Sequence, residues 1–145
     1  MHNARIDSTQ DLEGQTVVSA CFDLSDEEVA AAVHAVRATA GERYRSADLS
    51  AEDVLEFREL TAIADELSEP GAGARTVVLS PARLSTFRHA VEHFVETRTY
   101  AEWLRDEDRE PLELLRAMAL GLEQLCEEAI RAALTPQDRR AGRSH

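Results

Sequence analysis

The chain has 145 residues, of which 43% are hydrophobic and 30% charged, and this length and composition are sufficient for one domain with its own core. Its net charge of −12 repels nucleic acid at long range, so we expect no nucleic-acid partner. We expect no membrane partner either, because no apolar run approaches the roughly 18 residues that a membrane-spanning helix needs.

All 16 basic residues are arginines, and the absence of lysine excludes a P-loop lysine and Schiff-base chemistry. The high arginine and alanine content is typical of GC-rich bacterial coding. Cys21 and Cys126 lie far apart, and we expect two buried, reduced thiols. Residues 1–14 carry carboxylates where a signal peptide would be basic and apolar, so the sequence favours the cytoplasm.

Residues 1–14 are polar and lack a hydrophobic period, which predicts a flexible N-terminal arm. A β-branched and aromatic segment at 16–23 predicts the first strand. Ser25 and Glu28 then form a capping-box pattern, and we expect a helix over 26–40 that ends at a glycine cap, Gly41.

The middle of the chain contains a second capping signal, Ser50, and a helix predicted over 51–67. Proline and glycine residues make 68–74 a linker, and 75–79 is the second short strand. The strand, turn and helix at 16–30 and 76–90 form a faint internal repeat, so the two strands could pair within the chain or across a homodimer.

A third helix is expected to begin at Pro81, after the N-cap Ser80, and to break near 97–99. A short helix follows from Thr99 and presents Trp103. The last long helix is expected to end near Leu134, because proline follows at 136. Its predicted buried stripe consists of Leu112, Leu115, Met118, Ala119, Leu122, Cys126, Ala129, Ile130 and Ala133.

Together these elements predict an α+β, helix-dominated fold with about five helices, two short strands and a bundle-like helical core. Residues 15–135 form the single helical domain. It is flanked by the arm at 1–14 and by a basic, flexible tail at 136–145, which contains three arginines.

The string from His89 to His93 has the H-x-x-E-H arrangement, in which two histidines four residues apart can share a metal on one helix face. Glu92 could act as a general base, and Glu96 could supply a third ligand to zinc or iron. However, His89, His93 and Glu96 lie opposite the apolar stripe, and a solvated face is their default state. We therefore predict no cofactor, with this metal site as the alternative.

His34 lies on the polar side of the first predicted helix. It could join the other two histidines only if outer helix faces meet, for example across a dimer. Such a contact would respond to pH, because an unperturbed histidine has a pKa of about 6.5.

The last helix carries more apolar surface than one packing face needs. Leu114, Leu120 and Leu125 flank its main stripe, and Tyr100 and Trp103 lie beside the preceding break. These five residues are the candidate partner contacts.

The sequence favours a small noncatalytic regulatory or adaptor protein that binds other proteins and forms a homodimer. One alternative is a metal-dependent enzyme or metal sensor that uses residues 89–93. A second is an acidic nucleic-acid mimic or inhibitor, although arginines are mixed with the acidic residues along most helices, as on ordinary salt-bridged surfaces.

Overall fold

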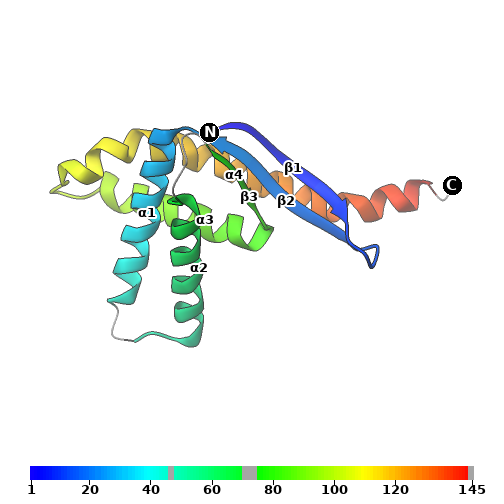
Figure 1. The fold of residues 1–145 in the computed structure, drawn as a ribbon, viewed down its shortest axis with the longest axis horizontal. Coiled ribbons are helices and arrows are strands. Elements are labelled where there is room, and N and C mark those ends of the chain that lie inside the picture. The colour runs from blue at the N-terminus through cyan, green and yellow to red at the C-terminus, as the bar shows by residue number, and fades with distance from the viewer. Residues whose placement is uncertain (46–47, 70–74, 144–145) are drawn as a thin grey trace.

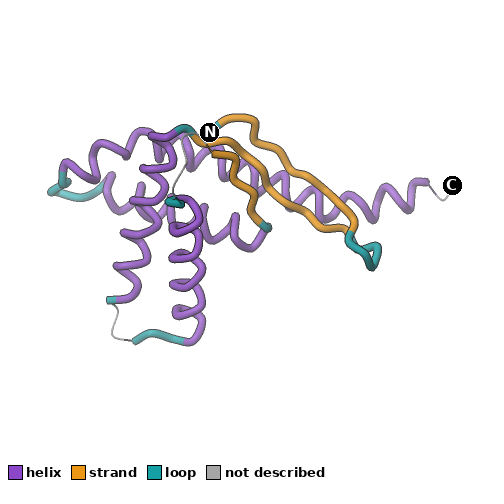
Figure 2. Tube along the Cα trace, in the orientation of Figure 1, coloured by secondary structure: helices purple, strands orange, loops and turns teal. Residues whose placement is uncertain are grey.

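The computed structural model describes residues 1–45, 48–69 and 75–143, with residues 44 and 135–143 described by their backbone alone. Four helices and a three-stranded antiparallel sheet make an α+β fold, so the predicted class is confirmed with one strand more and one helix fewer (Figures 1 and 2). The elements in chain order are β1 (His2–Gln10), β2 (Thr16–Leu24), α1 (Asp26–Tyr44), α2 (Ala51–Leu67), β3 (Arg75–Leu79), α3 (Pro81–Thr99) and α4 (Asp106–Arg143).

Residues 1–14, expected to form a flexible arm without a strand, instead contain β1, which pairs along β2 in a long hairpin. The hairpin turn is built around Asp11, whose carboxylate accepts hydrogen bonds from the backbone N–H groups of Glu13 and Gln15. Gly14 completes the turn with a φ of 79°, a conformation that glycine adopts without steric cost. β1 lies at the sheet edge and is largely exposed, so no hydrophobic alternation marks it in the sequence.

β2 is the central strand and pairs with β3 on its other side, in the order β1-β2-β3. The two strands of the internal repeat therefore pair within one chain. The linker expected at 68–74 lies largely outside the described residues.

The predicted helix starts are confirmed at three serine caps. Ser25 and Ser50 each form a complete capping box with the residue three positions later, and Ser80 accepts a hydrogen bond from the backbone N–H of Arg83. These contacts satisfy backbone N–H groups that have no partner inside the helix.

The helix ends differ from the predictions. α1 continues through Gly41 to Tyr44, so this glycine is not a cap. The residues after α3, which ends at Thr99, form no short helix before α4. The backbone of α4 continues past Pro136 to Arg143, so the predicted helix end near Leu134 is wrong.

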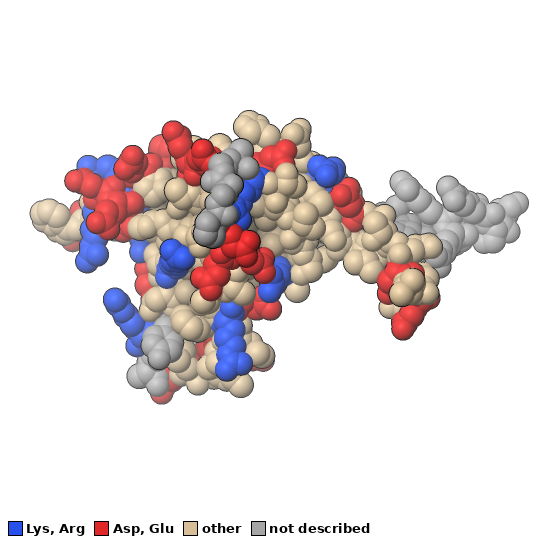
Figure 3. All heavy atoms as spheres, viewed as in Figure 1, with Lys and Arg blue, Asp and Glu red and all other residues tan. Residues whose placement is uncertain are grey.

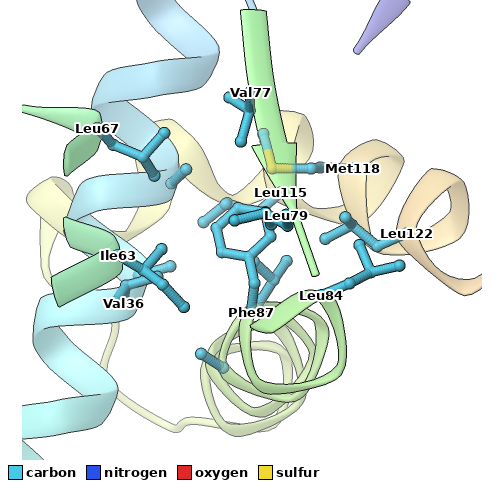
Figure 4. Packing of buried hydrophobic residues seen from close by; sticks show 14 of the residues in the cluster. Val36, Ile63, Leu67, Val77, Leu79, Leu84, Phe87, Leu115, Met118 and Leu122 are labelled. Atoms are coloured by element: carbon cyan, nitrogen blue, oxygen red, sulfur yellow. The ribbon is translucent and has the colours of Figure 1, made fainter. Parts of the chain in front are cut away.

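The core lies where the inner face of the sheet packs on α3 and α4, and α1 and α2 close it from the other side. Phe22 of β2 stacks on Phe87 of α3 with ring centroids 6.2 Å apart. In Figure 4, side chains from α1, α2, β3, α3 and α4 point toward one another around Phe87. Because α4 contacts α1, α3, β1 and β2, it connects the helical part to the sheet.

The β1–β2 hairpin and the second half of α4 project together away from the α1–α2 pair (Figure 1). We call the hairpin and α4 residues 120–134 the projecting unit. Across the described part of the chain, no helix has both the length and the hydropathy required to span a bilayer.

Candidate interaction site

The H-x-x-E-H string lies on α3, but its members turn to separate partners. His89 and Glu96 are exposed, and Nε2 of His93 lies 3.2 Å from Oε2 of Glu42 on α1. Glu92 accepts a 2.7 Å hydrogen bond from Nε of Arg88. Among the residues that the structure describes, no three histidine, cysteine, aspartate or glutamate side chains gather in a way that could hold a metal. The structure therefore does not assemble the predicted metal site.

Two histidines instead lie at the ends of a chain of hydrogen bonds and ion pairs that joins three helices. Nε2 of His34 on α1 lies 2.7 Å from Oδ1 of Asp108 on α4, and Oδ2 of Asp108 lies 3.5 Å from Nε of Arg98 on α3. Nη1 of Arg98 lies 2.6 Å from Oε1 of Glu42, and Oε2 of the same carboxylate contacts His93. We call these five side chains the charge network. It connects His34 with His93 within a single chain, whereas the sequence left such a meeting open only for outer helix faces, for example across a dimer; His89 does not join them.

Arg98 and Asp108 are the most buried members of the charge network, at 16% and 17% side-chain exposure. Burial opposes the charged form of Asp108, but the His34 hydrogen bond and the Arg98 guanidinium favour it more strongly, so the pKa of Asp108 lies below its ordinary value. The Arg98 guanidinium also lies 4.4 Å from the centroid of the Phe94 ring, and the same ring makes an edge-to-face contact with His34. The network is therefore anchored on the hydrophobic core.

A groove of about 550 Å³ lies beside this network, between α1 and the start of α4. Small or apolar side chains form its floor, His34 contributes to its wall, and three glutamates stand at its rim. We call it the α1–α4 groove, and its lining residues are Glu27, Ala30, Ala31, His34, Glu107, Glu110, Pro111 and Leu114. In Figure 3, acidic side chains gather around the part of the molecule where α4 begins.

The structure separates the five predicted partner contacts into three kinds. Trp103 and Tyr100 are 91% and 83% exposed in the loop between α3 and α4, and Leu120 is 65% exposed on α4. Leu114 is half-buried in the α1–α4 groove. Leu125 is only 2% exposed, so the prediction that it could bind a partner is wrong and it belongs to the core.

The prediction from the sequence did not include two further exposed apolar residues on α4. Ile130 was expected in the buried stripe, but it is 61% exposed, because at 100° per residue it lies about 140° around the helix from Leu125. Leu134 is 65% exposed as well. The spacing from Leu120, at 10 and 14 residues, could have placed both on its side of the helix.

Comparisons of the chain with protein-family models, with curated proteins and with solved structures find no significant match. The functional argument therefore depends on the surface of this chain alone.

Proposed function

We propose that the protein is a noncatalytic regulatory or adaptor protein of the bacterial cytoplasm, which binds other proteins and forms a homodimer through α4. The observation that carries this proposal is the exposure of Leu120, Ile130 and Leu134, each more than 60% exposed. At 100° per residue these three side chains lie within about 80° of one another around α4. Apolar side chains on one face of a projecting helix favour a helix–helix contact with a second chain.

The architecture of the projecting unit supports the same interpretation. A two-stranded hairpin is marginally stable alone, and here it has α4 on one side and carries exposed Val17 and Leu12. Contact with a second copy would remove these apolar surfaces from water. Trp103 and Tyr100, in the loop before α4, offer a separate surface to another partner, because large aromatic residues are prominent among binding hot spots.

Neither alternative function is favoured by a particular contact. The described residues assemble no metal-binding cluster. Much of the acidic surface is paired with arginine, as at Arg83 with Glu66 and Glu59, and such pairing leaves fewer free charges for mimicry of a phosphate backbone.

The dimer is tested by light scattering coupled to size exclusion. We expect the wild type to show twice the chain mass of 16.1 kDa, and Leu120→Glu/Ile130→Glu to show the monomer mass. The matched control is Leu49→Glu/Leu55→Glu, which places two charges at exposed leucines outside both the hairpin and α4 and should stay dimeric. A monomeric wild type at high protein concentration, or a monomeric control, would contradict the proposal.

A further inference from the structure

The rim of the α1–α4 groove carries negative charge that the protein does not neutralise itself. Glu27, Glu107 and Glu110 are exposed, and no ion pair within the described ranges involves any of them. Asp108, one residue from Glu107, is by contrast paired with both His34 and Arg98. Uncompensated carboxylates therefore stand over a floor that is mainly apolar.

The floor is shaped by small side chains. Ala30 and Ala31 on α1 leave space opposite Leu114 and Pro111 on α4, and both of the latter are only partly covered by the rest of the chain. A groove between two helices with such a floor suits the apolar face of a third helix, which can place residues at i, i+3, i+4 and i+7 along it. The glutamates would then lie beside the flanks of that helix.

We propose that the α1–α4 groove binds an amphipathic helix of a partner protein that carries arginine or lysine beside its apolar face. The apolar face packs on Ala30, Pro111 and Leu114, and the cations pair with Glu27, Glu107 and Glu110. Charge complementarity selects this partner, because an acidic helix would bring like charges together at the rim. A bound metal ion does not explain the rim, since these glutamates form no metal-binding cluster among the described residues.

This inference rests on the proposed protein-binding role, but it does not require the homodimer. The α1–α4 groove is formed by α1 and the first turns of α4, whereas the proposed dimer contact uses residues 120–134. The two surfaces can therefore be inactivated separately.

The probe is a synthetic amphipathic helical peptide of about five turns, with leucines at the spacing above and arginines on both flanks. Binding to the full chain is followed by fluorescence anisotropy of a dye on the peptide. We expect saturable binding that weakens as salt increases. Glu107→Arg/Glu110→Arg should weaken it about tenfold, which corresponds to about 1.4 kcal/mol.

The matched control is Glu52→Arg/Glu96→Arg, which changes the net charge equally at exposed positions outside both the groove and α4 and should shift the affinity less than about twofold. Ala30→Trp fills the floor from an exposed position on α1 and should abolish binding while the circular dichroism spectrum stays unchanged. If the control weakens binding as much as the rim variant, the attraction is only net charge and the proposal is overturned. It is also overturned if a peptide with glutamate in place of arginine binds equally well.

Light scattering on the same samples separates this inference from the proposed homodimer. Failure of the peptide to bind a dimeric wild type removes the groove proposal alone. Groove-specific binding by a monomeric wild type supports the groove proposal and removes the dimer alone.

Discussion

The substitution Asp108→Asn removes the charge at the centre of the charge network with almost no change in side-chain shape. Asp108 lies 2.7 Å from His34 and 3.5 Å from Arg98, and these three side chains are 17%, 36% and 16% exposed. A hydrogen bond to a charged group stabilises by about 1.5–3 kcal/mol, whereas an exposed ion pair contributes less than about 1 kcal/mol. Because these pairs are half-buried, we expect a loss of about 1–2 kcal/mol in the free energy of unfolding.

For a chain of this size, that loss corresponds to a fall of about 2–8 °C in Tm. The control is Asp106→Asn, two residues earlier in the same helical turn. Its side chain is 98% exposed and its ion pair with Arg109 is long, at 3.8 Å, so we expect a change within about 0.5 kcal/mol. Urea unfolding followed by circular dichroism measures both variants.

The pH dependence gives a sharper test of the same reasoning. The pKa of Asp108 is lower in the folded protein than in the unfolded chain, where it is about 3.9. The stabilisation is therefore fully present above about pH 4 and is lost as the pH falls through the lower, folded pKa. The difference between wild type and Asp108→Asn should shrink in that acidic window. A difference that does not change with pH, or an equal loss in Asp106→Asn, would refute the role given to this carboxylate.

Three further measurements test the packing. Leu125→Ala should lower the free energy of unfolding by about 2–5 kcal/mol because it opens a cavity in the core, whereas Leu55→Ala, at an exposed leucine of α2, should change it by less than about 0.5 kcal/mol; equal losses in urea unfolding would contradict the burial of Leu125. Burial raises the pKa of both Cys21 and Cys126, so an aromatic disulfide reagent should label them only after unfolding, and rapid labelling of the native protein would be inconsistent with this packing. Trp103 should show the red-shifted, acrylamide-quenched fluorescence of a hydrated indole in the native protein, and a protected, blue-shifted spectrum would show that its loop is covered.

The starts of the helices could be predicted because each depends on a few neighbouring residues. Ser25, Ser50 and Ser80 accept hydrogen bonds from backbone groups three positions later, and this contact needs nothing from the rest of the fold. The ends of the helices were less predictable. Gly41 can cap a helix or remain inside one, and the packing of α1 decides between these outcomes.

β1 was missed because the usual signal of a strand is a half-buried face. Its residues lie at the edge of the sheet and are mostly exposed, so their pattern is polar throughout. The turn that closes the hairpin did leave a local signal, since Asp11 and Gly14 are typical turn residues. A polar strand can thus be predicted from the residues of its turn when the strand itself shows no alternation of apolar and polar residues.

The charge network could not be predicted from the sequence, because its members come from three helices. Asp108 is one of three acidic residues in the first turn of α4, where carboxylates favour the start of a helix, and this local role does not indicate its distant partners. Arg98 could not be singled out, because nothing near it in sequence distinguishes it from the other arginines. Only the packing of α1, α3 and α4 brings them together.

The position of β3 has a consequence for the kinetics of folding. β1 and β2 are joined by a short turn and can pair early. In the β2–β3 pairing, by contrast, Leu24 lies opposite Arg75, and all of α1 and α2 separates these two residues along the chain. Contacts between residues far apart along the chain form slowly, because the intervening segment must be ordered first. We expect the sheet to be completed late, so that substitutions in β3 mainly accelerate unfolding and leave the refolding rate nearly unchanged.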